Sequence, residues 1–157
     1  MRWLALAMTL LLATVSASAL DVGAPAPELK VAVWLQGDAA SLDPADAKTI
    51  YVLDFWATWC GPCVQTIPHL NAITEQYKDK NVVVIGLSGE DEATVKPFAA
   101  KMNIHYRLAL DAESATTNAY IGEQGTIPTA FIVKGGKVLW SGHPLDDLDT
   151  VLEQVVA

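Results

Sequence analysis

The chain has 157 residues, of which 52% are hydrophobic and 18% are charged. This composition predicts one folded domain and excludes intrinsic disorder. The 10 basic and 18 acidic residues give a net charge of −8, which argues against nucleic-acid binding because such a surface repels phosphate backbones. The two cysteines, Cys60 and Cys63, are too few for a disulfide scaffold, so any function they have concerns this one pair.

The first nineteen residues have the pattern of a secretory signal peptide. Arg2 supplies a positive charge, residues 4–15 are apolar, and residues 17–19 read Ala-Ser-Ala, which is typical of a cleavage site. We expect cleavage before Leu20. The alternative is an uncleaved N-terminal membrane anchor, but a membrane span needs ~20 apolar residues and this run is shorter. The expected location is the periplasm or another exported compartment, which is oxidising, so free thiols there need a reducing supply.

Five segments are expected in the first half of the chain. They are an extended lead-in, a strand, a loop, a second strand and a helix, at residues 23–27, 29–35, 37–48, 50–56 and 61–78. The first strand is predicted because every second residue from Leu29 to Leu35 is apolar. The second strand is almost continuously apolar, which is typical of a central strand buried on both faces. The helix carries its apolar residues at helical spacing.

The second half of the chain is expected to alternate strands and helices. In order they are a strand, a helix, a strand, a helix, two strands and a helix, at residues 82–87, 91–102, 105–110, 112–120, 129–133, 137–140 and 145–155. The acidic run 90–92 is expected to begin the helix that follows it and to complement its dipole. The Lys-Gly-Gly sequence at 134–136 is typical of a hairpin. This order predicts a single α/β domain, with helices covering both faces of a central mixed β-sheet.

Cys60 and Cys63 lie where the predicted central strand gives way to a helix. The unpaired N–H groups and the positive dipole end of that helix would stabilise a thiolate at Cys60. Pro62 fits the first helical turn, because its missing N–H costs no hydrogen bond there. The two-residue spacing lets Cys63 reach back to Cys60 and close a small ring reversibly. The pattern therefore favours a redox-active pair.

Three alternative roles for the cysteine pair fit the sequence less well. A structural disulfide that closes so short a loop removes little entropy from the unfolded chain. A zinc site needs four ligands, and the histidines at positions 69, 105 and 143 do not follow a zinc-binding spacing. A reduced pair buried in the core does not suit an exported protein. Redox chemistry remains the leading hypothesis.

The segment from Val52 to Cys63, VLDFWATWCGPC, resembles the active-site segment of the thioredoxin superfamily. Pro68 matches the proline that bends the family's active-site helix. Residues 127–129, Ile-Pro-Thr, resemble the family's cis-proline loop, and the hairpin predicted after them follows in the expected place.

The predicted signal peptide, the opening residues 23–29 and the helix predicted at 91–102 narrow the resemblance to exported TlpA-like thiol-disulfide oxidoreductases. It covers roughly residues 23–153. Beyond the signal peptide predicted at 1–19, it implies a thioredoxin-like fold at 20–157. That fold would have an N-terminal strand extension and an extra helix inserted after the central strand.

The resemblance implies a role for each matching residue. Cys60 matches the attacking cysteine and Cys63 the resolving one, and the two would form the redox disulfide. Pro128 matches the proline whose cis bond lets the adjacent backbone, at Ile127, pair with a substrate strand.

Asp54 matches the family's buried carboxylate. The sequence supports this independently, because a lone carboxylate in an apolar strand must be solvated, paired or protonated. Burial raises the pKa of such a group, which suits a base that takes a proton from the Cys63 thiol. The alternative is an Asp whose side chain points into a hydrogen-bonded loop. Gly86 stands about where cytosolic thioredoxins carry a lysine near this carboxylate, so that partner is missing. Trp59 is expected to face the substrate, and Trp56 to pack in the core.

The leading hypothesis is an exported enzyme that reduces protein disulfides and is recharged by a membrane thiol-electron donor, as the resemblance implies. We expect a monomer without a cofactor or resident metal, and a cytochrome-maturation role does not follow. A different class is a copper-delivery module that uses both cysteines with His143. A thiol peroxidase would need Thr or Ser where Ala57 stands, and Arg107 is the only arginine beyond the signal peptide. His69 is expected to be solvated rather than catalytic.

Overall fold

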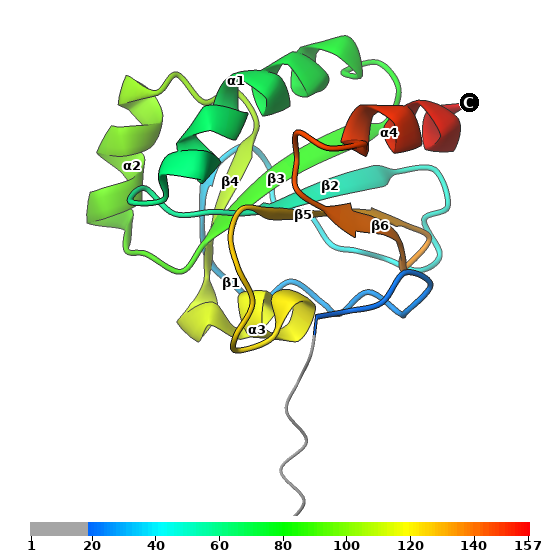
Figure 1. The fold of residues 1–157 in the computed structure, drawn as a ribbon, viewed down its shortest axis with the longest axis horizontal. Helices are drawn as coiled ribbons and strands as arrows, with labels where there is room; N and C mark the ends of the chain where they lie inside the picture. Colours follow the sequence, from blue (N-terminus) through cyan, green and yellow to red (C-terminus); the bar gives the residue numbers. More distant parts are fainter. Residues whose placement is uncertain (1–18) are drawn as a thin grey trace, which may run out of the picture.

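The computed structural model describes residues 19–157, so the predicted signal peptide, apart from Ala19, lies outside the described residues (Figure 1). Within this range the elements follow the order expected from the sequence. Strands β1 to β6 span Val31–Gln36, Ile50–Phe55, Val82–Ser88, Arg107–Asp111, Thr129–Lys134 and Lys137–Gly142. Helices α1 to α4 span Gly61–Gln76, Glu92–Lys101, Ala115–Ile121 and Leu148–Val156. None of the helices in the described range is long and apolar enough to cross a membrane.

The strands form one mixed sheet in the order β1-β4-β3-β2-β5-β6. β2 pairs in parallel with β3, and β3 with β4, whereas the other pairs are antiparallel. Every residue of β2 is buried, as its continuous apolar run predicts. β2 and β3 run in parallel register up to the pair Phe55 and Leu87. The loops that follow these two strands therefore begin at the same edge of the sheet.

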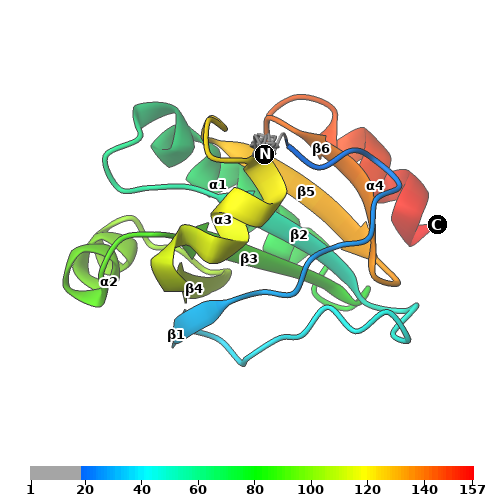
Figure 2. The ribbon, with the colours of Figure 1, turned by 90° about the horizontal axis from the view of Figure 1, so that it is seen from below.

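Helices cover both faces of the sheet. Figures 1 and 2 show α1, α2 and α4 on one face and α3 on the other. Helices α1, α2 and α4 contribute Ile67, Val95 and Leu152, respectively, to one buried core. α3 contributes Tyr120 to the second core, and its hydroxyl donates to the carbonyl of Pro27 at 2.8 Å. The N-terminal segment is thereby tied to the α3 face.

β1 is present as predicted but does not bury one regular face. Two register shifts, one on each side of Val33 and Trp34, interrupt its pairing with β4. Such irregularities disturb the period-two alternation of an edge strand. As a result Val33 is exposed, Trp34 packs against the α3-side core, and Leu35 packs against the opposite core. The alternation expected from residue 29 to residue 35 is therefore not realised as a single buried stripe.

The segment after β4 was expected as one helix and instead forms two pieces. A 3₁₀ turn precedes α3, and Glu113 and Ser114 at the junction have positive φ angles of 53° and 56°. Asp111, the last residue of β4, accepts hydrogen bonds from the N–H groups of Thr116 and Thr117 at 2.8 and 2.7 Å. A carboxylate from the preceding strand thus satisfies the first turn of α3 across the kink.

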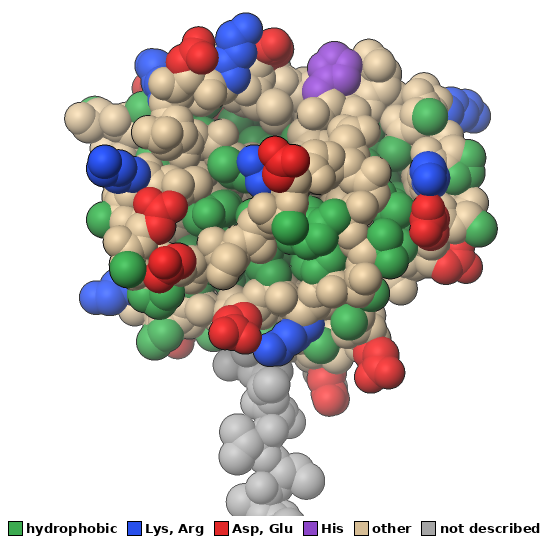
Figure 3. Space-filling model, turned by 180° about the vertical axis from the view of Figure 1, so that it is seen from behind, with side chains coloured by type: hydrophobic (Ala, Val, Ile, Leu, Met, Phe, Trp, Pro, Cys, Tyr) green, Lys and Arg blue, Asp and Glu red, His purple; other side chains and the backbone are tan. Residues whose placement is uncertain are grey.

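Charges on the surface are mixed. On the face in Figure 3, acidic and basic side chains are interspersed, and hydrophobic side chains gather between them. A phosphate backbone would meet no continuous basic patch on that face.

Candidate active site

Cys60 is the N-cap residue of α1, at the point where the chain leaves the central sheet. Its sulfur accepts a hydrogen bond from the N–H of Cys63 at 3.2 Å, and its carbonyl accepts one from the N–H of Val64 at 3.1 Å. Pro62 stands in the first turn, where the absence of an N–H costs no bond. A thiolate at Cys60 would therefore be stabilised by an N–H group and by the positive end of the helix dipole.

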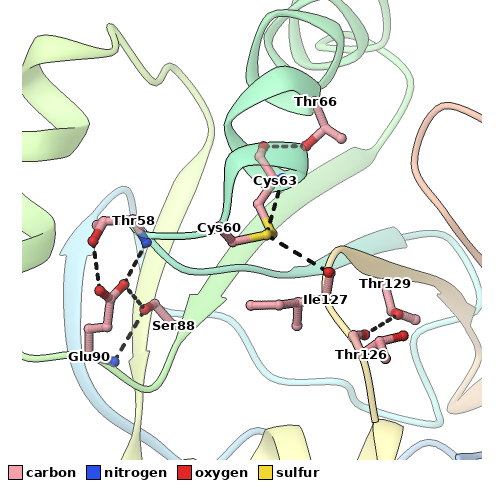
Figure 4. The surroundings of a disulfide bond; sticks show 9 residues. All are labelled: Thr58, Cys60, Cys63, Thr66, Ser88, Glu90, Thr126, Ile127 and Thr129. Atoms are coloured by element: carbon pink, nitrogen blue, oxygen red, sulfur yellow. Dashed lines mark hydrogen bonds between the residues drawn. A yellow bond between two sulfur atoms is a disulfide. The ribbon is translucent and has the colours of Figure 1, made fainter.

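Cys60 and Cys63 are joined by a disulfide, with their Cα atoms 5.2 Å apart. Cys60 is 5% exposed and Cys63 is 1% exposed. The carbonyl of Cys63 accepts a hydrogen bond from the Thr66 hydroxyl at 2.8 Å, inside the first turns of α1 (Figure 4). Both cysteines are thus buried in the oxidised protein, and Cys60 is the more exposed of the two.

The predicted substrate-contacting residues lie around Cys60. Trp59 is 75% exposed, whereas Trp56 is buried, as expected. The carbonyl of Ile127 lies 3.8 Å from the Cys60 sulfur (Figure 4), and the Ile127–Pro128 peptide bond is cis. A disulfide sulfur carries no proton, so this contact becomes a hydrogen bond only when Cys60 is a thiol. The fold thus places the loop before β5 beside the cysteine pair.

A hollow of about 280 Å³ opens beside Trp59. Its walls come from the carboxyl ends of β2 and β3, from the start of α3, and from the loop that carries Ile127. Much of the lining is apolar, and Trp59, Leu87 and Ile127 all contribute to it. Glu90 is the charged residue in the lining. An apolar side chain next to a partner's cysteine would find space here.

Asp54 lies in β2 on the same side as Val52 and Trp56, which belong to the core beneath α1. It is fully buried, and among residues 19–157 neither carboxylate oxygen has a hydrogen-bond partner. Burial raises the pKa of Asp54 to about 7, because desolvation disfavours the charged form. The alternative of a side chain that points into a hydrogen-bonded loop is wrong, because neither oxygen of Asp54 has a partner in the described range. A group that exchanges its proton near neutral pH is able to act as a base.

Gly86 pairs with Asp54 in the parallel register of β2 and β3. A Cβ atom on Gly86 would lie 3.0 Å from Nε1 of Trp56 and 3.1 Å from Cε2 of Tyr106. Within the described part of the chain, the Trp56 indole N–H and the Tyr106 hydroxyl are also buried without a hydrogen-bond partner. The surroundings of Gly86 are thus closely packed by Leu108 and two aromatic rings, and Gly86 supplies no cation to Asp54.

Glu90 has a different role from the one predicted for the acidic run 90–92. α2 begins at Glu92, and Asp91 is its N-cap. Glu90 instead points back and accepts hydrogen bonds from the N–H and the hydroxyl of Thr58, at 2.8 and 2.7 Å (Figure 4). The sequence held a signal for this contact. Glu90 follows β3 by two residues, and the loops after parallel neighbouring strands begin at the same edge.

The remaining candidates do not join the cysteine pair. Among residues 19–157, no three His, Cys, Asp or Glu side chains form a group that could hold a metal ion. His143 accepts a backbone N–H within its own loop. His69, expected to be solvated, is partly buried with Nε2 3.1 Å from Oδ2 of Asp149 on α4. The guanidinium of Arg107 donates to the carbonyl of Asp38 at 2.8 Å.

The chain is similar to known proteins over most of its length. The family model described as AhpC/TSA matches residues 22–141. The thiol-disulfide oxidoreductase ResA of Bacillus cereus is 32% identical over 122 residues, which cover 76% of this chain and 68% of that protein. ResA of Geobacillus kaustophilus is 32% identical over 123 residues, which cover 77% and 68% of the two chains.

Solved structures share the fold. A Chlorobium tepidum protein described as a thiol:disulfide interchange protein DsbE superposes with a TM-score of 0.69 at 30% identity, covering 88% of this chain and 96% of that one. The thioredoxin domain of a Bacteroides vulgatus thiol-disulfide oxidoreductase gives a TM-score of 0.75 at 22% identity, covering 88% of this chain and all of that domain, and supports the fold alone. The expected thioredoxin-like fold is confirmed. The chain therefore belongs to the AhpC/TSA family, among its thioredoxin-like thiol-disulfide oxidoreductases.

Proposed function

We propose that this oxidoreductase is exported and reduces the disulfides of other proteins. The observation that carries the proposal is the position of Cys60, whose sulfur accepts the Cys63 N–H at 3.2 Å and lies 3.8 Å from the Ile127 carbonyl. This position combines a stabilised thiolate with a backbone loop beside it. The proposed export rests on the signal-peptide pattern of residues 1–19.

In the first step, the Cys60 thiolate attacks one sulfur of a partner's disulfide. A bond forms between Cys60 and that sulfur, the partner's S–S bond breaks, and the partner's other sulfur leaves as a thiolate that takes a proton from water. Trp59 and the backbone at Ile127 and Pro128 are the proposed contacts with the partner, because they surround Cys60 on the exposed side of the site.

In the second step, Asp54 takes the proton of the Cys63 thiol, directly or through water. The Cys63 thiolate attacks the Cys60 sulfur, the Cys60–Cys63 disulfide forms, and the partner's second sulfur leaves as a thiolate that takes a proton from water, while Asp54 returns its proton to water. The partner has then gained two electrons and two protons, and the enzyme has lost them. We propose that a membrane thiol-electron donor returns the electrons and that the enzyme acts as a monomer.

The Cys63→Ser variant tests the reaction, because it removes the internal thiol that resolves the mixed disulfide. Reduced Cys63→Ser protein should accumulate exported partners attached covalently to Cys60, and a reductant should release them. The matched control is the double variant in which Cys60 is also Ser, which should attach none. Absence of reductant-sensitive complexes, with Cys60 shown to be reduced and reactive, would overturn the reductase proposal.

The copper-delivery alternative predicts a different outcome for the same variant. Cys63→Ser would trap little and would weaken Cu(I) binding by the reduced protein, as would His143→Ala. No structural observation favours this alternative, because His143 forms no metal-binding group with the cysteines in the described range.

Export has its own test. When the full-length chain is expressed, the exported fraction should contain protein whose N-terminal residue is Leu20. Recovery in the membrane with residues 1–19 attached would show an anchor in place of a cleaved signal peptide. Light scattering of the recovered protein gives its oligomeric state, for which we expect one chain.

A further inference from the structure

Glu90 connects the loop after β3 to the loop that carries Cys60. Its carboxylate accepts hydrogen bonds from three donors, namely the N–H and hydroxyl of Thr58 at 2.8 and 2.7 Å and the hydroxyl of Ser88 at 3.0 Å (Figure 4). The Ser88 hydroxyl also accepts the N–H of Glu90 at 3.2 Å. Ser88 is buried at the end of β3, so the Glu90 side chain is held in place from the sheet while it holds Thr58.

Thr58 lies inside the turn that delivers Cys60. The N–H of Cys60 donates to the carbonyl of Ala57 at 3.2 Å, which closes a four-residue turn with Thr58 and Trp59 at its central positions. Just before the turn, the N–H of Trp56 donates to a β3 carbonyl at 3.1 Å. The turn is thus fixed at its start by the sheet, at its end by α1, and at its centre by Glu90.

Stabilisation of α2 does not account for this arrangement. Asp91 accepts the N–H of Thr94 at 2.8 Å as the N-cap, and Glu92 supplies the acidic residue of the first turn. These two residues meet the needs of a helix N-terminus. Glu90 points away from the helix and lines the hollow beside Trp59.

We propose that Glu90 is a positioning residue for the thiol-disulfide reaction. It acts through Thr58 and sets how Cys60 lies against the Cys63 N–H and how Trp59 faces a partner. Hydrogen bonds to a charged acceptor are stronger than those between neutral groups, so the carboxylate fixes the turn more firmly than an amide would. Loss of the carboxylate should slow attack by Cys60, because the sulfur leaves its alignment with the helix N-terminus.

The test compares Glu90→Gln with Glu92→Gln, a matched control that removes one acidic charge from the same run without touching the turn. Insulin is the disulfide substrate, and the rate of a single turnover is measured with reduced protein. Glu90→Gln should slow attack about tenfold, and Glu92→Gln should match the wild type. If wild-type protein leaves insulin oxidised, the reductase proposal fails, and the pH profile of Cys60 alkylation then decides the Glu90 proposal by itself.

The pH profile of Cys60 alkylation separates positioning from a general effect on charge or stability. Loss of alignment with the Cys63 N–H predicts a higher midpoint in Glu90→Gln, because the thiolate loses a hydrogen bond. Simple removal of a negative charge predicts a lower midpoint, and a purely structural role predicts no change. A lower or unchanged midpoint overturns the proposal.

Substitutions at Thr58 test the route of action independently of Glu90. Thr58→Val removes the hydroxyl donor and should slow attack, whereas Thr58→Ser keeps both donors and should retain the wild-type rate within about twofold. The double variant that combines Thr58→Val with Glu90→Gln should be little slower than the slower single variant, because both substitutions disturb the same contact between Glu90 and Thr58. Fully additive effects would contradict action through Thr58.

Discussion

Asp54 and Glu90 are carboxylates in elements beside the Cys60–Cys63 disulfide, but the fold surrounds them differently. Asp54 is enclosed in β2, and among residues 19–157 it has no hydrogen-bond partner, so burial raises its pKa to about 7. Glu90 is partly buried in a loop, between two exposed residues, and accepts hydrogen bonds from three donors. Desolvation without partners prepares a carboxylate for proton exchange, whereas several donors fix it as an anchor.

The contrast supports the proposal that the two carboxylates serve different steps. Asp54 lies in the core beneath α1, where Cys63 is buried, and is placed to help the resolving cysteine. Glu90 bonds the turn that ends at Cys60 and is placed to help the attacking cysteine.

Asp54→Asn should stabilise the oxidised protein by about 4 kcal/mol at pH 8 and by less than about 1 kcal/mol at pH 4. The pKa of Asp54 is about 7 in the folded chain against an ordinary value of 3.8. Between these values the unfolded chain has lost the proton and the folded chain keeps it, so wild-type stability falls as pH rises and levels off above pH 7. Asn does not ionise and escapes this loss. Denaturant unfolding at both pH values measures the gain, and an equal gain at both would contradict the raised pKa.

Asp54→Asn should also slow resolution of the mixed disulfide about 100-fold at neutral pH, because a general base is lost. In the wild type the resolution rate should rise with pH through about 7, where Asp54 ionises, and this rise should disappear in the variant. Stopped-flow release of a thiol preloaded on Cys60 measures the step. Wild-type resolution by the variant from pH 6 to pH 8 would make Asp54 merely structural.

Glu90→Ala should destabilise the protein by about 2 kcal/mol at both pH 6 and pH 8, the opposite sign from Asp54→Asn at pH 8. It leaves the donors of Thr58 and Ser88 without their acceptor, and water recovers part of the loss. Glu92→Gln is the control, because it removes a pair with Lys96 at 3.1 Å and the first-turn charge of α2, and it should cost less than about 1 kcal/mol. The same unfolding measurement applies, and a stability gain in Glu90→Ala would remove the contrast.

Gly86→Ala should cost about 1–2 kcal/mol of stability through overpacking. Its Cβ would lie 2.9 Å from Cδ2 of Leu108 and 3.0 Å from Nε1 of Trp56, and both neighbours belong to the packed core. Thermal or denaturant unfolding measures the cost. A substitution without effect on stability would show that the surroundings of Asp54 adjust easily, which would contradict a rigid, desolvated site that raises the pKa of Asp54.

Most of the fold follows from local patterns. The apolar run of β2 and the apolar faces of the helices predict their elements correctly, because each pattern depends on a buried face alone. The predicted and observed ends of the strands and helices agree within three residues. The pairing of β1 and the break before α3 were missed. β1 changes register where β4 meets it, and Asp111 of β4 caps α3 beyond two residues of positive φ. Both depend on contacts that a single segment does not contain.

The candidate site divides in the same way. Cys60, Cys63 and Asp54 occur within ten residues and were found from the motif and the apolar strand. Glu90 was missed because its contact with Thr58 spans 32 residues, and an acidic run before a helix has an ordinary local role.

The sequence by itself determined the chemistry: two thiols at a helix start, a carboxylate in an apolar strand, and a proline loop to pair with them. Only the tertiary structure decided which carboxylate would lie without a partner and which would be bound by three donors. The reason is that desolvation and hydrogen bonding depend on neighbours, and those of Asp54 and Glu90 come from strands and loops distant in the chain.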